Sequence, residues 1–279
     1  MIPPQFEYYR ASSIDDAIRA LSEDPNAKAL AGGQSLIPLL KLRALSPSKL
    51  VDIGRIKELR YIKQAGRGLA VGALTTHADL ERWGGPCGVL PEAAKQIGDP
   101  QIRSMGTIGG SLAHADPAAD WPAVVLALGA VIKAVGPSGP REVPAEEFFQ
   151  GPYATALQQG ELITEVLVPE CPPRYSYVKI ARAYNDFAIA GVAAAVWVDG
   201  GYINEIKLAA TGVGLKPIRL KKAEEAAQGR RASEEVLLEV AEAASKEVDA
   251  ISDVRASAEY RRAMAGVAAR RALRRALGL

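Results

Sequence analysis

Hydrophobic and polar positions follow two different periods along this chain, and together they predict a protein of mixed helix and strand. Apolar residues at helical spacing predict helices at 14–21, 36–42, 76–83, 117–128, 233–248 and 257–277. Several of these segments are preceded by a residue that can cap a helix. Short apolar or alternating runs predict strands at 28–31, 50–53, 61–65, 69–73, 130–135, 162–168, 175–181, 188–198 and 202–210. Glycine-rich turns at 66–68 and 199–201 are expected to join their flanking strands into hairpins.

The order of these elements predicts an α+β protein built of three subdomains. Pro169, Pro172 and Pro173 mark one boundary between subdomains. Beyond these prolines, an antiparallel sheet is followed by two alanine-rich helices, which we expect to cover one face of that sheet. The expected subdomains are residues 1–55, 56–172 and 173–279.

The charge balance and the length of the apolar runs exclude several classes of protein. Thirty-four basic against 32 acidic residues leave a formal charge of +2, far from the basic surface of a nucleic-acid-binding protein. The longest uncharged apolar run, 187–198, falls well short of the roughly 20 residues that span a bilayer. Residues 1–5 have neither the basic nor the apolar region of a signal peptide, so we expect a cytoplasmic protein without a membrane span.

The small number of cysteines and histidines indicates that a cofactor supplies the chemistry. Cys87 and Cys171 are the only cysteines, and an iron–sulfur cluster or a structural zinc normally needs about four ligands. In a cytoplasmic protein we expect both to be reduced. His77 and His114 are the only histidines, so we expect no metal site in this chain.

Two glycine pairs stand out because the usual nucleotide-binding motifs are missing. The chain contains neither Gly-x-Gly-x-x-Gly nor Gly-Lys-Ser/Thr. The first glycine segment is Ala31-Gly32-Gly33-Gln34-Ser35, and the second is Thr107-Ile108-Gly109-Gly110-Ser111. We interpret both as loops in which glycine permits positive φ, successive amides form an anion-binding nest, and hydroxyl groups add donors. One Gly-Gly pair is usually just a turn, but two pairs about 75 residues apart are suited to hold a pyrophosphate from opposite sides.

Together the two glycine segments carry a family resemblance. Ala-Gly-Gly-Gln-Ser at 31–35, followed by Thr-Ile-Gly-Gly-Ser-Leu-Ala-His-Ala-Asp-Pro-Ala-Ala-Asp at 107–120, resembles the FAD-binding medium subunit of molybdenum hydroxylases. The resemblance is to the carbon monoxide dehydrogenase type, related to the central domain of xanthine dehydrogenase, and extends from Phe6 to the C-terminal helices. It implies a fold similar to the vanillyl-alcohol-oxidase type of FAD-binding domain. Two N-terminal lobes would hold FAD noncovalently, and a C-terminal α+β subdomain would pack beside the flavin.

The resemblance also implies which residues contact FAD. One side of the pyrophosphate is assigned to Leu30, Ala31, Gly32, Gly33, Gln34, Ser35 and Leu36, and the other to Thr107, Ile108, Gly109, Gly110 and Ser111. Asp120 corresponds to the family's acidic FAD ligand and Lys179 to a basic contact. Leu162 or Ile163 corresponds to an apolar position near the cofactor.

Some polar residues near these segments allow two interpretations. His114 and Asp116 follow the second glycine segment, where they would either reach FAD or act as capping and surface residues, and we include His114 among the candidate FAD contacts. We assign His77 to a capping box that begins at Thr76, rather than to covalent flavin attachment. The polar turn at 182–186 corresponds to a segment near the isoalloxazine ring that can gate acceptor access in the family, although the sequence itself shows only a loop.

The function implied by the resemblance is that of an electron-transfer flavoprotein subunit. Substrate would be oxidised at a molybdenum cofactor in a large subunit, and electrons would cross two [2Fe-2S] clusters in a small subunit to FAD and an external acceptor. The family resemblance implies three different subunits, usually doubled into a two-fold heterohexamer. We expect the docking surface to lie at the flavin cleft, where the second glycine segment meets the C-terminal subdomain, rather than at the basic tail 270–275.

Other functions stay open at this point. A stand-alone FAD-dependent oxidase or dehydrogenase of the same fold is the main alternative, and a cofactor-free scaffold subunit is another. Two cysteines cannot hold the additional iron–sulfur cluster of hydroxybenzoyl-coenzyme A reductase flavin subunits, which disfavours that type. The sequence does not specify the substrate among carbon monoxide, an aldehyde and an N-heterocycle. It also does not specify the acceptor among a quinone, oxygen, NAD and a protein carrier.

Overall fold

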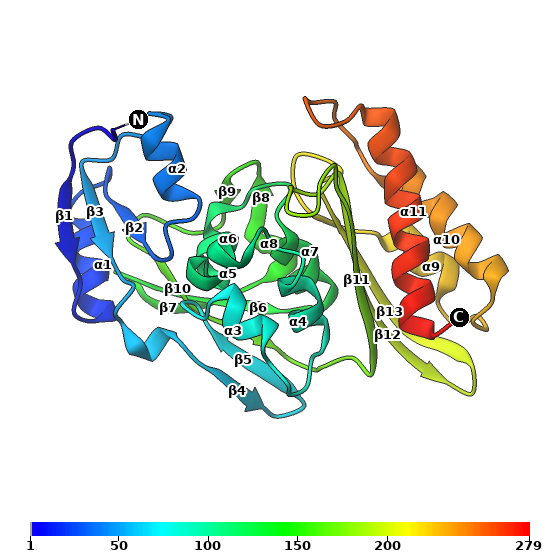
Figure 1. Ribbon diagram of the computed structural model, residues 1–279. Coiled ribbons are helices and arrows are strands. Elements are labelled where there is room, and N and C mark those ends of the chain that lie inside the picture. Colours follow the sequence, from blue (N-terminus) through cyan, green and yellow to red (C-terminus); the bar gives the residue numbers. More distant parts are fainter. Residues whose placement is uncertain (1) are drawn as a thin grey trace.

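Three main sheets follow one another along the described chain, from the N-terminal lobe at the left of Figure 1 to the C-terminal helices at its right. The computed structural model describes residues 2–279. The first lobe is a parallel sheet in the order β1-β3-β2. Its elements are β1 (Glu7–Arg10), α1 (Ile14–Ser22), β2 (Lys28–Leu30), α2 (Leu36–Lys41) and β3 (Lys49–Asp52). Ser13 caps α1 by accepting a hydrogen bond from the Asp16 N–H, as the sequence predicts.

The central lobe is an antiparallel five-stranded sheet in the order β4-β5-β10-β6-β7. Its strands are β4 (Ile62–Ala65), β5 (Gly68–Gly72), β6 (Val131–Gly136), β7 (Gly139–Pro144) and β10 (Leu162–Val168). The helices between β5 and β6 are α3 (His77–Glu81), α4 (Val89–Ala94), α5 (Pro100–Met105), α6 (Ile108–His114) and α7 (Asp120–Ala127). The lobe also contains η1 (Lys57–Leu59), α8 (Ala145–Phe148), β8 (Phe149–Gly151) and β9 (Ala154–Thr155).

The C-terminal domain is an antiparallel sheet in the order β11-β12-β13-β14, with helices over one face (Figure 1). Its elements are β11 (Arg174–Ile180), β12 (Ala190–Asp199), β13 (Tyr202–Thr211), β14 (Ile218–Arg219), α9 (Lys221–Ala227), α10 (Glu234–Glu247) and α11 (Ala258–Leu277). As predicted, the alanine-rich helices cover this sheet: α11 lies against β11 and β12, and α10 packs on α9 and α11. Within residues 2–279, no helix is both long enough and apolar enough to cross a membrane.

The opposite face of the C-terminal sheet packs on the central lobe, and we call this contact the domain junction. Helix α7 contacts β12 and β13, and it also contacts α4, α6 and α8. All eight residues of α7 are therefore buried. The sequence predicted one apolar stripe on this helix, but the helix packs against neighbours on every side. Trp121 on α7 and Tyr177 on β11 are among the largest fully buried side chains of the molecule.

At the domain junction, side chains of α4 and of the turn that follows it take the place of a neighbouring strand for β11. The outer edge of β11 is not paired with another strand of its sheet. Glu92 accepts hydrogen bonds from the Tyr177 N–H at 3.1 Å and the Ser176 hydroxyl at 3.2 Å. The Gln96 side-chain amide donates to the Tyr177 carbonyl at 3.0 Å. These contacts satisfy buried backbone groups of an edge strand and fix the position of α4 on it.

Most of the predicted elements are confirmed, but one predicted helix start is wrong. Asp116 and Pro117 do not begin α7, because Ala119 precedes its first residue. Instead, the Asp116 carboxylate accepts a hydrogen bond from the Ala118 N–H at 2.8 Å and forms a tight turn. The Pro117 carbonyl accepts hydrogen bonds from the Gly212 N–H and the Thr211 hydroxyl, so the C-terminal domain holds this turn in place.

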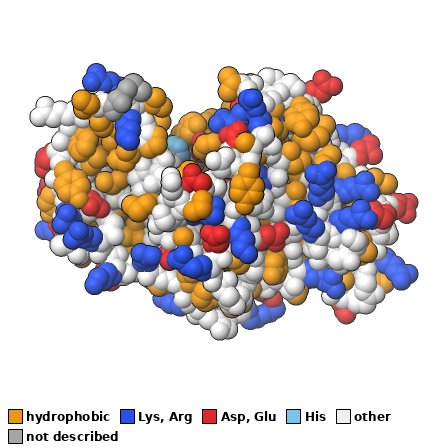
Figure 2. Space-filling view, viewed as in Figure 1, with side chains coloured by type: hydrophobic (Ala, Val, Ile, Leu, Met, Phe, Trp, Pro, Cys, Tyr) orange, Lys and Arg blue, Asp and Glu red, His pale blue; other side chains and the backbone are white. Residues whose placement is uncertain are grey.

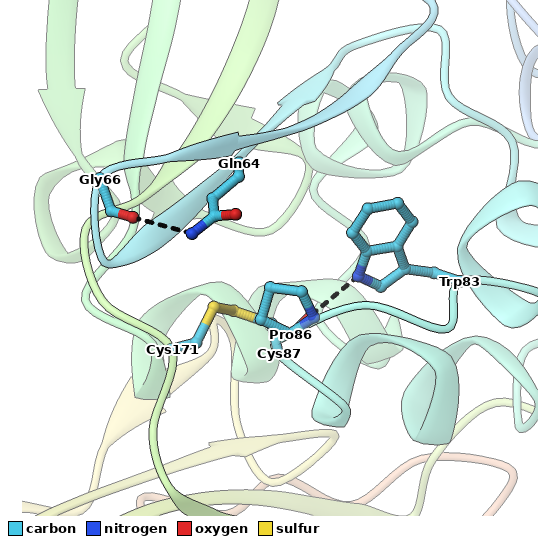
Figure 3. The surroundings of a disulfide bond; sticks show 6 residues. All are labelled: Gln64, Gly66, Trp83, Pro86, Cys87 and Cys171. Atoms are coloured by element: carbon cyan, nitrogen blue, oxygen red, sulfur yellow. Dashed lines mark hydrogen bonds between the residues drawn. A yellow bond between two sulfur atoms is a disulfide. The ribbon is translucent and has the colours of Figure 1, made fainter.

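The expectation that both cysteines are reduced is also wrong in this structure. A disulfide joins Cys87, in the loop between α3 and α4, to Cys171, in the linker between β10 and β11 (Figure 3). The two Cα atoms are 4.8 Å apart, although the residues are separated by 84 positions in the sequence. The number of cysteines could not reveal this pairing, because it depends on how the 83–88 loop and the linker meet in the fold. The division into three subdomains at 55 and 172 remains a prediction.

Candidate cofactor-binding cleft

The two glycine segments lie against each other, at the point where the first lobe meets the central lobe. A Cβ atom added to Gly32 would lie 2.9 Å from the Cα of Gly106 and would overlap the carbonyl group of Met105. A Cβ added to Gly110 would lie 3.8 Å from the Cβ of Ala31. Figure 2 shows a hollow between the N-terminal lobe and the rest of the molecule on this face. Close backbone contact between segments far apart in the sequence therefore requires glycine at position 32.

The first glycine segment presents a series of unpaired backbone donors. Gly33 has a φ of +73°, a left-handed conformation that glycine adopts without steric cost. Within residues 2–279, none of the five amide N–H groups from Gly32 to Leu36 donates a hydrogen bond to another group. The Ser35 side chain makes no capping hydrogen bond to α2, so its hydroxyl is also available. Such a row of N–H groups is typical of a nest that binds an anion.

The second glycine segment differs from its prediction as a loop, because Gly109 and Gly110 lie in the first turn of α6. The Thr107 side chain caps this helix by accepting a hydrogen bond from the Gly110 N–H at 3.1 Å. The N–H groups of Ile108, Gly109 and Ser111 donate to the carbonyls of Thr75, Ala73 and Thr107. The backbone donors from Ile108 to Ser111 are thus already used, and the segment offers the hydroxyl groups of Thr107 and Ser111 instead.

Gly109 serves packing rather than a loop conformation. A Cβ at this position would lie 2.6 Å from the Cβ and 2.8 Å from the carbonyl oxygen of Ala73. The Gly109 N–H donates to that same carbonyl at 2.9 Å. Contact of this kind holds α6 against the end of β5 and leaves no space for a side chain.

Asp120 and Lys179, two residues assigned to FAD by resemblance, form a buried ion pair with each other. The Lys179 Nζ lies 3.1 Å from the Asp120 Oδ2, and the side chains are 5% and 6% exposed. The Tyr177 hydroxyl donates to the Asp120 Oδ1 at 2.6 Å, and Lys179 also donates to the Gln96 carbonyl at 2.9 Å. Burial raises the pKa of Asp120, while the Lys179 charge and the two hydrogen bonds oppose that rise. The pair joins α7 to β11 across the domain junction, and the Asp120 carboxylate retains unused lone pairs.

His114 packs against an aromatic residue that the sequence analysis did not single out. Its ring lies 5.1 Å from the ring of Tyr153, centroid to centroid. The Tyr153 N–H donates to the Ala115 carbonyl at 3.0 Å, and both residues have left-handed backbone conformations, with φ of 54° and 51°. Burial lowers the pKa of His114, and the nearby Asp116 carboxylate acts in the opposite direction. No local sequence pattern marks Tyr153, because it meets His114 only through the tertiary fold.

The two apolar candidates, Leu162 and Ile163, belong to different buried clusters. Leu162, 5% exposed, belongs to the buried cluster of the first lobe, against which Ala31 packs. Ile163, its neighbour on β10, points into the core of the central lobe. Of the two alternatives left open by the sequence, Leu162 is the one whose cluster includes the first glycine segment.

The polar turn at 182–186 belongs to the C-terminal domain, where an ion pair joins it to a second loop of that domain. Asp186 pairs with Arg255 at 3.4 Å, and the Arg255 guanidinium lies 5.2 Å from the ring centroid of Phe187. Tyr184 is 84% exposed. The sequence analysis missed Arg255, which comes about 70 residues after the turn and carries no motif of its own.

His77 is buried, and it contacts the residue just before the second glycine segment. Its Nδ1 accepts a hydrogen bond from the Trp121 Nε1 at 3.0 Å, and its backbone N–H donates to the Gly106 carbonyl at 2.9 Å. The capping box of Thr76 and Asp79 is present, as predicted. Burial lowers the pKa of His77 to about 4, and the charge of Arg103 acts in the same direction. The neutral imidazole thus serves as the hydrogen-bond acceptor for the buried Trp121 side chain.

Comparison with known proteins decides the family. Residues 4–171 match the model of the FAD-binding domain in molybdopterin dehydrogenase. The chain belongs to this family. Residues 175–276 match the C-terminal domain of the carbon monoxide dehydrogenase flavoprotein. The predicted family and α+β fold are thereby confirmed.

Relatives of this FAD-binding family match the chain over almost its full length. The glyceraldehyde dehydrogenase medium chain of Sulfolobus acidocaldarius is 41% identical, over 94% of this chain and 95% of that protein. The carbon monoxide dehydrogenase medium chain of Hydrogenophaga pseudoflava is 39% identical, over 98% and 97%. Carbon monoxide dehydrogenase from Hydrogenophaga pseudoflava, solved without the Mo-pyranopterin moiety, superposes with a TM-score of 0.97 at 40% identity, covering 100% of this chain and 99% of that chain. Quinoline 2-oxidoreductase from Pseudomonas putida 86 gives a TM-score of 0.95 at 32% identity with the same coverage.

Acidification should destabilise this flavoprotein through His77. The folded chain keeps His77 neutral down to about pH 4, whereas an unfolded histidine binds a proton below its ordinary pKa of 6.5. The contribution of His77 to stability is thus complete above pH 6.5 and is lost progressively between pH 6.5 and 4, by about 3 kcal/mol in total.

The matched variant is His77→Gln, whose amide oxygen accepts the Trp121 hydrogen bond but does not titrate. We expect the unfolding free energy of the native chain to fall relative to that of the variant as the pH drops through this window. Chemical denaturation of both proteins across the pH range measures the difference. A difference that stays constant with pH would contradict the buried, neutral state of His77.

Proposed function

We propose that this chain is the FAD-binding, electron-transfer subunit of a molybdenum hydroxylase. The observation that carries the proposal is the row of five amide N–H groups from Gly32 to Leu36, unpaired within the described residues 2–279, in a segment that lies against the second glycine segment in a chain of the FAD-binding family. Electrons would arrive from iron–sulfur clusters of a partner subunit and leave to an external acceptor. Substrate oxidation would take place at the molybdenum cofactor of another subunit.

The residues of the cleft fit a pyrophosphate. Its negative charge needs several hydrogen-bond donors, and the first glycine segment supplies consecutive N–H groups together with the Ser35 hydroxyl. The Thr107 and Ser111 hydroxyls add donors from the other side. We assign the noncovalent hold on FAD to these groups, with Gln34, Ala31 and Leu30 beside them and with Gly109 and Gly110 providing close approach. His114, Asp120, Leu162 and Lys179 complete the proposed cofactor environment.

FAD, when bound, supplies the redox chemistry, and the residues of this chain bind and orient it. The first segment fixes the phosphate end through its backbone, which is held by the contact of Gly32 with Met105 and Gly106. The domain junction fixes the C-terminal domain beside the cleft through Asp120, Lys179 and Tyr177. No side chain of this chain is assigned a role as general acid or base in the proposal.

The names of the relatives favour a subunit over a stand-alone oxidase. The relatives include a protein named as a medium chain of carbon monoxide dehydrogenase and one named as a medium subunit of nicotine 6-hydroxylase.

We further propose a small iron–sulfur subunit and a large molybdenum subunit as partners, doubled into a two-fold heterohexamer in the cytoplasm. Exposed side chains around the cleft provide a docking surface: Met105, Tyr153 and Tyr184 are 54%, 61% and 84% exposed. On the basic tail, by contrast, Arg270 and Arg274 both pair with Glu234 of the same chain. This difference supports placing the interface at the cleft.

Gly33→Ala should weaken FAD binding. A Cβ is strained at a φ of +73°, so we expect the free variant to relieve this strain by turning the neighbouring amides away from the anion, and FAD binding must then restore it. The cost of about 1–2 kcal/mol corresponds to a roughly 5- to 30-fold higher Kd for FAD, measured by quenching of flavin fluorescence. Gly66→Ala is the matched control, because Gly66 also has a positive φ (59°) but lies in the β4–β5 hairpin, away from the cleft.

The control should bind FAD within about twofold of the native chain, since its side chain meets no other atom within 4 Å. Equal FAD affinity of all three proteins would show that the first glycine segment is not the anion site. A native chain that takes up no FAD would overturn the proposed function as a whole.

The placement of the interface is tested by two surface variants in a co-expressed complex. Tyr184→Ser changes an exposed residue at the cleft, and the double variant Arg271→Glu, Arg275→Glu reverses charge on the exposed side of α11. We expect Tyr184→Ser to reduce co-purification of the small subunit and the double variant to leave it unchanged, with FAD content equal in both. The reverse pattern would move the interface to the tail.

A further inference from the structure

The disulfide links two segments that border the domain junction. Cys87 lies two residues before α4, and Cys171 lies three residues before β11 (Figure 3). Glu92 on α4 and Gln96, just after α4, hold this helix and strand β11 together. The cross-link therefore ties together the leading ends of both elements, directly beside the hydrogen bonds between them. Both cysteines fall within the first family-model match, whose last residue is Cys171, and the second match begins four residues later, at 175.

The loop that carries Cys87 has little to hold it apart from this link. It contains Gly84, Gly85, Pro86 and Gly88, and its one side-chain hydrogen bond within the described residues runs from the Trp83 Nε1 to the Pro86 carbonyl, at 2.7 Å. Cys87 itself has a φ of +64°, a conformation that residues with a Cβ rarely adopt. A loop rich in glycine with a left-handed cysteine keeps one conformation when a covalent bond fixes it.

The loop that carries Cys87 packs on β11 so closely that a side chain at Gly88 would not fit. A Cβ at Gly88 would overlap the hydroxyl group of Tyr175, the second residue of β11. The Cys171 N–H donates to the Arg67 carbonyl at 3.1 Å, which fixes the linker to the β4–β5 hairpin. The linker side of the cross-link is thus placed by a backbone hydrogen bond, whereas the loop side has the packing of Gly88 on Tyr175 and the sulfur–sulfur bond.

The two sulfur atoms have different surroundings. Cys87 is 3% exposed and belongs to the core cluster of the central lobe, whereas Cys171 is partly exposed and packs against that cluster from outside. A reducing thiolate reaches Cys171 first, and its attack would displace Cys87 as a thiolate inside an apolar core. Burial disfavours the charged form, so this exchange is slow while the core stays closed.

We propose that Cys87 and Cys171 form an oxidative cross-link that fixes the linker leading into the C-terminal domain to the loop before α4, and so locks the start of β11 against α4. It forms by thiol–disulfide exchange with a small-molecule disulfide of the glutathione type. The two cysteine thiols give up two protons and two electrons, one S–S bond forms in the protein, and the S–S bond of the oxidant is reduced to two thiols. The inference is independent of FAD binding, because it concerns the junction behind the cleft.

The first experiment tests whether the cross-link exists in the folded protein. The purified full-length chain is incubated with oxidised glutathione, denatured without reductant, treated with iodoacetamide and weighed by mass spectrometry. We expect no alkylation and a mass lower than that of the dithiol form by two hydrogen atoms. Two alkylated cysteines, or glutathione attached to either one, would overturn the proposal.

The second experiment tests what the cross-link does. Hydrogen exchange is compared between the oxidised chain and the double variant Cys87→Ser, Cys171→Ser, or the chain reduced in denaturant and refolded if the variant does not fold. We expect α4 and β11 to exchange at least about tenfold faster without the link, while β1, β2 and β3 remain unchanged. Glu92→Ala, which loosens the same contact but keeps the link, should show a smaller increase confined to the residues around Tyr177. Equal exchange rates of α4 and β11 with and without the link would contradict the proposed lock.

Discussion

The contact of Gly32 with the backbone of Met105 and Gly106 is the constraint on which the cleft depends. Any side chain at position 32 would separate the first lobe from the central lobe at this point. Because the contact is made, Ala31 lies beside Gly110 in the first turn of α6. Within residues 2–279 the N–H groups from Gly32 to Leu36 pair with no other group, so we propose that they bind an anionic ligand.

The two glycine pairs look alike in sequence but have different physical roles. Gly33 allows a left-handed turn and leaves its neighbouring amides free. Gly109 lies inside a helix whose first amides are all paired, and its lack of a side chain lets α6 pack on Ala73. The clamp expected from two similar loops is therefore asymmetric. In the proposed site, one side would contribute backbone donors, and the other would contribute hydroxyl groups and a surface that supports them.

Local signals in the sequence predicted much of the fold, and tertiary contacts explain what they missed. Ser13, Thr76, Ser233 and Ser257 each cap the predicted helix. The same rule failed at Asp116, because its carboxylate closes a turn whose carbonyls bind the C-terminal domain. Family resemblance named Asp120 and Lys179, but not their ion pair or the role of Tyr177. Those contacts, like the disulfide, join segments that only the folded chain brings together.

Hydrogen exchange of the folded chain with and without FAD tests the asymmetric cleft most directly. The amides from Gly32 to Leu36 have no acceptor among the described residues 2–279, so they should exchange rapidly in the free protein and become strongly protected when FAD binds. The amides of Ile108, Gly109 and Ser111 are paired within the chain, so they should be protected before FAD is added. Protection by FAD at the second segment, with 32–36 unchanged, would contradict the account.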